Sequence, residues 1–223
     1  MLDERLALCA EFVRKDTKLA DVGTDHAYLP VWLAKNKIIT SAVASDVRQG
    51  PLDNALSNIE GNNVGGIVKA VLSDGLDKIS PDEADDIVMA GMGAQLMIRI
   101  IDRTQWLRDP EKRLILQPMT RAEELRLYLC ENGFSVISEK ACVCHKKTYS
   151  VMCCEYDGVR RSCSDEFMYI GGLSEDKSSH ALRYISVVNM RLKKKLRGLP
   201  PGSDEYKRIS ELTEKFDTYT GEG

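Results

Sequence analysis

The sequence predicts an α/β fold: a mostly parallel sheet with one antiparallel edge strand, followed by a C-terminal α-helical coiled-coil hairpin. Short β-branched or apolar runs alternate with helix-length amphipathic segments over the first two-thirds of the chain. Two closely spaced apolar runs follow, and then apolar residues recur at helical spacing around a Pro/Gly-rich break. Strands separated by helix-length connections are typical of βαβ units and a parallel sheet.

The predicted strands follow in chain order. Those of the parallel sheet are expected at residues 19–22, 42–45, 67–72, 86–90 and 114–117. Amphipathic segments between them, such as 52–59 and 96–101, are expected to be helices. Two further strands, at 135–142 and 149–156, are separated by a short segment that suits a hairpin at the sheet edge.

After Gly171 and Gly172 the sequence changes character, because apolar residues recur at steps of three or four. They are Ala181, Ile185, Val188, Leu192 and Leu196, and then Tyr206, Ile209, Leu212, Phe216 and Tyr219. Two such stripes around a Pro/Gly break predict an antiparallel, coiled-coil-like helical hairpin. Ser203 or Asp204 is expected to cap the second helix.

Composition limits the class of protein. With 223 residues, 43% hydrophobic and 29% charged, the chain can bury one large core and is not intrinsically disordered. No apolar run approaches the roughly 18–20 residues of a membrane span, and the N-terminus has no signal-peptide pattern. We therefore expect a cytoplasmic protein with no membrane partner.

The seven cysteines do not suggest a disulfide framework. Cys142, Cys153 and Cys154 fall in the strands expected at 135–142 and 149–156, where successive side chains point to opposite faces, and Cys144 lies just beyond the first of these strands. Zinc knuckles prefer pairs borne on turns. We expect buried, reduced thiols and no metal.

The net charge of −3 hides an asymmetry. Residues 177–223 hold 10 basic and 6 acidic residues, a net of +4, whereas residues 1–176 hold 21 and 28, a net of −7. The basic residues of the first tail helix are Arg183, Arg191, Lys193, Lys194, Lys195 and Arg197. They suit an RNA partner and equally suit a solvated helix face.

The chemistry is expected at the strand ends, because open α/β sheets bind ligands beyond the carboxyl ends of their strands. The first predicted strand leads into Asp21 and Gly23, and the glycine allows a tight turn close to a ligand. Pro30 suits the first turn of the helix that follows. The sequence lacks G-x-G-x-x-G at this point, which argues against an NAD oxidoreductase.

The next three strand ends add to this site. Asp46 can accept hydrogen bonds from two ribose hydroxyls, and Asp74, followed by Gly75, can accept one from an adenine amino group. Gly91 belongs to a small-residue segment at the end of the fourth strand. Each of these residues alone could instead simply stabilise a turn. Together they indicate a site for a nucleoside with a cationic or amino-acid tail.

This order of motifs resembles the class I S-adenosylmethionine (SAM)-dependent methyltransferases, which have a Rossmann-like sheet. More narrowly, four segments resemble the bacterial TrmK family, whose members methylate N1 of adenine 22 in tRNA. These segments are Arg5-Leu6, the string Ala-Asp-Val-Gly-Thr-Asp-His-Ala-Tyr-Leu-Pro at 20–30, Ala-Gly-Met-Gly at 90–93, and Leu-Ile-Leu-Gln-Pro at 114–118.

The resemblance implies a Rossmann-like SAM-binding catalytic domain at 1–160 and a tRNA-contacting helical hairpin at 161–223. It places around SAM the residues Asp21, Gly23, His26, Asp46, Asp74 and Gly91, with Val47, Ser73 and Gly75 as walls of the adenine pocket. The ammonium group of SAM is expected beside Asp21 or Asp25, and its carboxylate beside the backbone at Gly23. The expected cofactor is SAM and the expected partner is tRNA. The enzyme is expected to be a monomer or a weak dimer.

N1 of adenine carries an in-plane lone pair, so it can attack the methyl group without prior loss of a proton. Catalysis then depends mainly on alignment and on stabilising the cationic product. Asp21 or Asp25 is expected to supply that stabilisation, with His26 and Arg5 positioning the base or its phosphate; His26 could instead cap a helix. Tyr28 could stack on the base or belong to the core.

Two other functions are compatible with the sequence. A SAM-dependent enzyme acting on a small molecule would not need the basic hairpin. A non-catalytic RNA-binding protein that has kept a SAM pocket would bind tRNA and transfer nothing.

Overall fold

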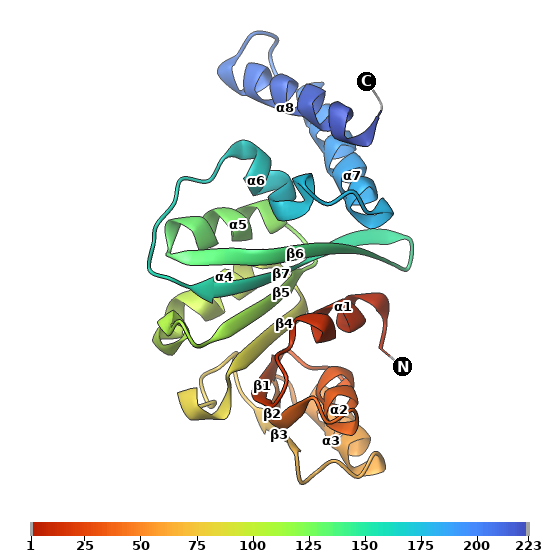
Figure 1. Ribbon diagram of the computed structural model, residues 1–223, viewed down its shortest axis with the longest axis vertical. Helices are drawn as coiled ribbons and strands as arrows, with labels where there is room; N and C mark the ends of the chain where they lie inside the picture. The colour runs from red at the N-terminus through yellow and green to blue at the C-terminus, as the bar shows by residue number, and fades with distance from the viewer. Residues whose placement is uncertain (1, 222–223) are drawn as a thin grey trace.

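The computed structural model describes residues 2–221. Its centre is a seven-stranded sheet with the order β3-β2-β1-β4-β5-β7-β6, with helices on both faces (Figure 1). The first five strands pair in parallel. They are β1 (Thr17–Val22), β2 (Ile39–Asp46), β3 (Val68–Leu72), β4 (Asp86–Met92) and β5 (Arg113–Pro118). Each contains or closely overlaps a strand expected from the sequence.

The hairpin of β6 (Phe134–Cys144) and β7 (Lys147–Tyr156) is also confirmed, but its placement differs from the prediction. The antiparallel strand β7 lies between β5 and β6, so it is internal and β6 forms the edge. The burial of the two strands explains this order. Residues 150–154 of β7 are all buried, whereas β6 has exposed positions that suit a strand open to solvent on one side.

Two core clusters lie on opposite faces of the sheet. One contains α1 (Glu4–Phe12), α2 (Tyr28–Lys35) and α3 (Gln49–Gly61). The other contains α4 (Ala94–Arg103) and α5 (Ala122–Glu131). Neighbouring residues of a strand point to opposite faces of the sheet, so Leu19 of β1 lies in the first cluster and Ala20 in the second.

Helix α1 was not expected from the sequence. It begins after Asp3, whose carboxylate accepts a hydrogen bond from the Leu6 backbone N–H at 2.9 Å. This cap satisfies one of the unpaired donors of the first turn. Its consequence for the site is that Arg5 is held on a regular helix.

A helical extension projects beyond the β6 edge of the sheet (Figure 1). It consists of α6 (Asp165–Ile170), α7 (Ser179–Leu196) and α8 (Asp204–Thr220). The predicted apolar stripes of α7 and α8 lie in or against one shared core cluster, except Tyr206, which is not part of it. Ser203 is the N-cap residue of α8, accepting a hydrogen bond from the Tyr206 N–H, as the sequence suggested.

One buried ion pair joins this extension to the sheet. Arg126 of α5 and Glu139 of β6 are both fully buried, with Arg126 Nη2 2.6 Å from Glu139 Oε1. The Arg126 guanidinium also donates to the backbone carbonyls of Met168 and Tyr169, both in α6, at 3.0 Å. The hydroxyl of Tyr184, in α7, lies 3.2 Å from Arg126 Nη2.

The described part of the chain, residues 2–221, contains no helix with both the length and the apolar character needed to cross a membrane. All seven cysteines are free thiols, and six of them are buried.

Replacing Arg126 with methionine should lower the free energy of unfolding by about 3–5 kcal/mol, because Glu139 would remain buried without its partner. The double variant Arg126→Met with Glu139→Leu should recover most of that loss. Urea unfolding measures both values. A double variant less stable than the single one would contradict this account.

Candidate active site

A crevice lies at the carboxyl ends of β1 to β4, where the sheet order reverses between β1 and β4. This reversal is the point at which open α/β sheets bind ligands. The crevice consists of a larger cavity of about 1060 Å³ and a smaller one of about 410 Å³. The two cavities share Gly23, Arg48, Ala90 and Gly91, so they are parts of one site.

The smaller cavity contains every residue that the sequence assigned to a nucleoside. These residues are Asp46, Val47, Ser73, Asp74 and Gly75. The Asp46 carboxylate is largely buried at the end of β2, and one of its oxygens accepts a hydrogen bond from the Arg48 backbone N–H at 2.8 Å. Its other oxygen accepts no hydrogen bond from residues 2–221, which leaves it available to a hydroxyl.

Two of these residues have partners that the sequence did not predict. The Ser73 hydroxyl accepts a hydrogen bond from the Lys78 N–H, so its side chain folds into its own loop. Asp74 is exposed and pairs with Arg103 at 3.0 Å. The hydrogen bond from Arg103 holds the pKa of the Asp74 carboxyl below its usual range.

Gly23 shows why the first turn needs glycine. Its φ of +79° lies in the left-handed region, and a Cβ there would come 2.7 Å from the Met92 methyl carbon. The chain can therefore turn sharply after β1 and leave its backbone facing the crevice.

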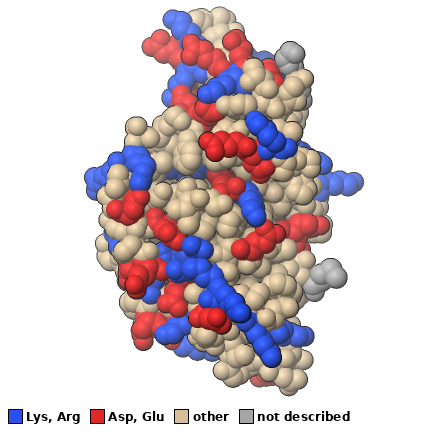
Figure 2. Space-filling model, viewed as in Figure 1, with Lys and Arg blue, Asp and Glu red and all other residues tan. Residues whose placement is uncertain are grey.

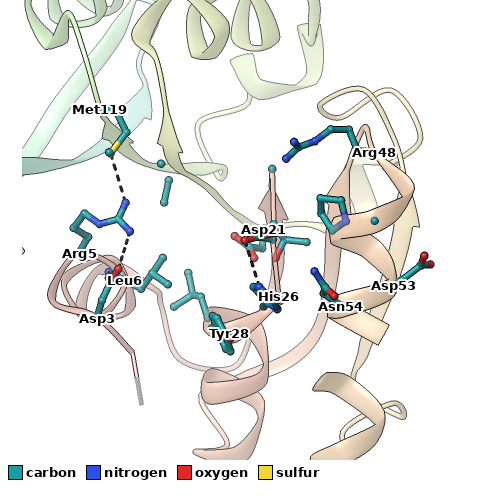
Figure 3. Close-up of a pocket in the computed structure, with 18 residues that line it drawn as sticks. Asp3, Arg5, Leu6, Asp21, His26, Tyr28, Arg48, Asp53, Asn54 and Met119 are labelled. Carbon is teal, nitrogen blue, oxygen red and sulfur yellow. Dashed lines mark hydrogen bonds and ion pairs between the residues drawn. The ribbon is translucent and has the colours of Figure 1, made fainter. Parts of the chain in front are cut away.

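The larger cavity brings together all four candidate catalytic residues: Arg5, Asp21, Asp25 and His26. In Figure 3, Arg5 from α1 faces Asp21 and His26 across the open space. These residues come from two separate parts of the sequence, and the fold places them around one volume.

Asp21 is the buried acid of this cavity. Burial raises the pKa of its carboxyl to about 6, and a hydrogen bond with Thr24 partly opposes that shift. With this pKa the carboxyl is mostly ionised at physiological pH and takes up a proton as the pH falls through about 6, and a cationic ligand group beside it would further favour its charged form.

Asp25 and His26 form an open pair at the mouth of the cavity. His26 Nε2 lies 3.4 Å from Asp25 Oδ2, and the Asp25 side chain is 69% exposed. The imidazole stacks on Tyr28 with a centroid distance of 4.9 Å and an interplanar angle of 21°. His26 does not cap α2, because the N-cap residue is Ala27 and no side chain accepts a hydrogen bond there.

Arg5 is held by residues that the sequence analysis did not assign to the site. Its guanidinium donates to Asp3 Oδ2 at 2.7 Å and to Gln117 Oε1 at 3.1 Å. The same Gln117 oxygen accepts the Gly91 backbone N–H at 3.1 Å. Gln117 is fully buried at the end of β5, and it fixes both Arg5 and the floor of the crevice.

Gln117 lies within the Leu-Gln-Pro segment that supported the family resemblance, so a signal for it was present. Asp53 and Asn54 of α3 also line the larger cavity (Figure 3). No motif pointed to them. Among residues 2–221, no group of three or more His, Cys, Asp or Glu side chains could hold a metal ion.

The seven-stranded sheet with its inserted antiparallel strand, and the acids at the ends of β1 and β2, define a class I SAM-dependent methyltransferase. The family described as “Methyltransferase domain” matches residues 2–152. The class predicted from the motifs is confirmed.

Similar proteins identify the family within this class. The chain is 31% identical to the tRNA (adenine(22)-N(1))-methyltransferase of Bacillus subtilis over 190 residues, which are 82% of this chain and 79% of that protein. The structure of M. capricolum TrmK in complex with S-adenosyl-homocysteine matches with a TM-score of 0.81 at 26% identity, covering 99% of this chain and 98% of that one. Streptococcus pneumoniae Sp1610 in complex with S-adenosyl-L-methionine matches with a TM-score of 0.85 at 29% identity, covering 99% and 100%. The chain belongs to the TrmK family.

SAM affinity should depend on pH through Asp21. The ammonium group of SAM needs a carboxylate, so affinity should be full above about pH 7 and fall about tenfold per pH unit below about 6, where Asp21 takes up a proton. Calorimetric titration between pH 5 and 8 measures this dependence.

Asp21→Asn should bind SAM weakly at every pH in that range. Asp25→Asn is the matched control, because this exposed carboxylate lies nearby, and it should keep the decline at low pH. An unchanged pH dependence in Asp21→Asn would contradict the role of Asp21.

Proposed function

We propose that this protein transfers the methyl group of SAM to N1 of adenine 22 in tRNA. The observation that carries the proposal is the 31% identity, over 82% of the chain, to a tRNA (adenine(22)-N(1))-methyltransferase. The geometry agrees with a nucleic-acid substrate, because the larger cavity is about 1060 Å³ and is bordered by an exposed aromatic side chain, Tyr28.

The residues of the crevice fit SAM. Asp21 is a buried carboxyl that lines the larger cavity and suits the ammonium group, while the backbone at Gly23 suits the carboxylate. Asp46 suits the ribose hydroxyls, and Val47 and Gly75 suit the sides of the adenine. Asp74 suits the adenine amino group, and its carboxylate is already paired with Arg103.

Bound SAM supplies an electrophilic methyl group on a sulfonium centre. The protein has to present adenine N1 in line with that methyl group and keep bulk water out. No proton has to leave first, because the N1 lone pair lies in the plane of the ring. The protein therefore contributes alignment and charge stabilisation, and it needs no strong base before transfer.

We assign the exposed side of the larger cavity to the target base. Tyr28 and His26 form a stacked pair that offers an aromatic face to an adenine. Asp25, beside His26, can stabilise the positive charge that methylation puts on the ring. Arg5, fixed by Asp3 and Gln117, can hold a phosphate or the base edge.

We propose that the hairpin within residues 161–223 acts as a coiled-coil arm that contacts tRNA phosphates. Its basic residues are not equivalent. Lys193 pairs with Asp217 at 2.6 Å and Lys195 with Glu205 at 2.7 Å. Figure 2 shows acidic and basic side chains intermixed over this part of the molecule.

Three basic residues of α7 and its C-terminal cap remain available for RNA. Arg191, Lys194 and Arg197 are exposed and form no ion pair within the described chain. Arg183 is also exposed without an ion pair, but its guanidinium donates to the Lys146 backbone carbonyl at 3.3 Å. The RNA contact expected from the run of basic residues therefore falls mainly on these three.

Methyl transfer from labelled SAM should occur to an unmodified tRNA transcript with adenine at position 22 and not to one with guanine there. A reverse-transcription stop at that position should appear in parallel. Asp21→Ala, which removes the buried acid, is the negative control. If the protein binds SAM but labels neither transcript, a small-molecule substrate or a non-catalytic RNA-binding protein is favoured. A tRNA-binding assay then distinguishes between these two functions.

The triple variant Arg191→Ala, Lys194→Ala, Arg197→Ala should bind tRNA more weakly and with less dependence on salt. Each lost phosphate contact lowers the slope of log affinity against log salt by about 0.7–0.9. Filter binding at several salt concentrations measures the slope, while SAM affinity should not change.

Lys15→Ala is the control for that variant, because Lys15 is exposed before β1, at the end of the sheet away from the crevice. It should leave both affinities unchanged. Equal salt slopes for the triple variant and the parent enzyme would show that these hairpin residues do not contact tRNA phosphates.

A further inference from the structure

A second recess adjoins the larger cavity at Tyr28. It has a volume of about 220 Å³ and lies between α2 and the C-terminal end of α3. Tyr28 lines both the larger cavity and this recess, so the two adjoin at that residue. None of the assignments made for SAM or for the target adenine uses this recess.

The recess has an exposed aromatic wall. Trp32 is 37% exposed and Tyr28 is 50% exposed, and they stand one helical turn apart on α2. The core contact of α2 is made by other residues, including Leu29, Leu33 and Ala34. Trp32 belongs to none of the three core clusters, and more than a third of its surface remains exposed to solvent.

Leu2 and Val31 add apolar surface to the recess, and the rest of its lining is polar and carries one cation. Lys35 Nζ donates to Asn62 Oδ1 at 2.8 Å, and Asn62 Nδ2 donates to Asn58 Oδ1 at 2.9 Å. Asn58 Nδ2 in turn donates to the His26 backbone carbonyl at 2.7 Å. This chain of hydrogen bonds fixes the recess relative to the Asp25–His26 pair of the active site.

The charge of the recess suits an anion. No acidic residue lines it, and Lys35 forms no ion pair with any residue between 2 and 221. An aromatic face for a base beside a cation for a phosphate is the combination by which proteins hold unpaired nucleotides.

We propose that this recess binds the nucleotide adjoining the target adenosine in the RNA strand, with its base against Trp32 and its phosphate toward Lys35. The inference rests on the proposed function. If the target base enters the larger cavity beside Tyr28, the next nucleotide of the strand must lie close to Tyr28 as well. The recess begins at that same ring. Capturing the neighbour helps to keep the target out of its stack.

The first test compares Trp32→Ala with Trp32→Phe in the full-length enzyme. Trp32→Ala should raise KM for tRNA about tenfold, the scale of one lost base–aromatic stack, with kcat changed less than KM. Trp32→Phe keeps a stacking ring and should recover most of the loss. SAM affinity and melting temperature should stay at the parent values in both variants.

Leu56→Ala is the matched control, since Leu56 is an exposed apolar residue of α3 that does not line the recess. It should leave KM for tRNA unchanged. Loss of SAM affinity or of melting temperature in Trp32→Ala, or no recovery in Trp32→Phe, would show that Trp32 acts only in the protein structure and would overturn the proposal.

The second test removes the partner base. Transcripts carrying an abasic site on the 5′ or the 3′ side of adenine 22 are assayed with the parent enzyme and with Trp32→Ala. For one of the two positions, the abasic site should lower kcat/KM about tenfold with the parent enzyme and have little further effect with Trp32→Ala. Independent, multiplying effects at both positions would overturn the proposal and leave a protein partner as the occupant of the recess.

The two proposals fail in different ways. If the parent enzyme does not methylate intact tRNA, the proposed function is wrong. If it does so and Trp32→Ala keeps the parental KM, only the assignment of the recess is wrong.

Discussion

The Arg126 guanidinium lies fully buried between the sheet and the C-terminal helices, and its partners come from four elements. Glu139 of β6 neutralises it, and its N–H groups also donate to two α6 carbonyls, to the Ser150 hydroxyl of β7 and to the Tyr184 hydroxyl of α7. A buried charge is tolerated only when its partners are in place. The pair therefore specifies one orientation of the hairpin relative to the sheet.

The surrounding backbone is adapted to this pair. Glu139 Oε2 accepts the Gly172 N–H at 3.3 Å, and a Cβ on Gly171 would lie 1.8 Å from that same oxygen. Glycine at 171, with φ +58°, lets the chain cross directly over the carboxylate before α7 begins. The two glycines that marked a change of character in the sequence thus mark the joint between the sheet and the hairpin.

The same sheet carries the active site, so the joint also relates the site to the arm. β7 pairs with both β6 and β5, and near its C-terminal end β5 carries Gln117, which holds Arg5 and the Gly91 backbone. A nucleic acid gripped by α7 would be held in a fixed relation to Arg5 and to the Asp25–His26 pair. On the proposal that the hairpin contacts tRNA, this connection would help to align the target base, and alignment is the main requirement of a methyl transfer to a ring nitrogen.

The sequence by itself determined the strands, the helical stripes of α7 and α8, and the acids at the strand ends. Each depends on a local property: a period of two or of three to four, or a turn that needs glycine. Asp21, Gly23 and Asp46 could be assigned because a parallel sheet brings the ends of its strands together.

Only the tertiary structure decided which residues meet across long separations. Local patterns could not show that β7 lies between β5 and β6 in the sheet, or that Asp217 neutralises Lys193. They also could not show that Gln117 accepts a hydrogen bond from Arg5, which is 112 residues away in the sequence. Nor could they reveal Trp32 as exposed, since one tryptophan in an apolar helix suits a core equally well. Such pairings depend on the burial and geometry of the whole fold, which no short window of sequence contains.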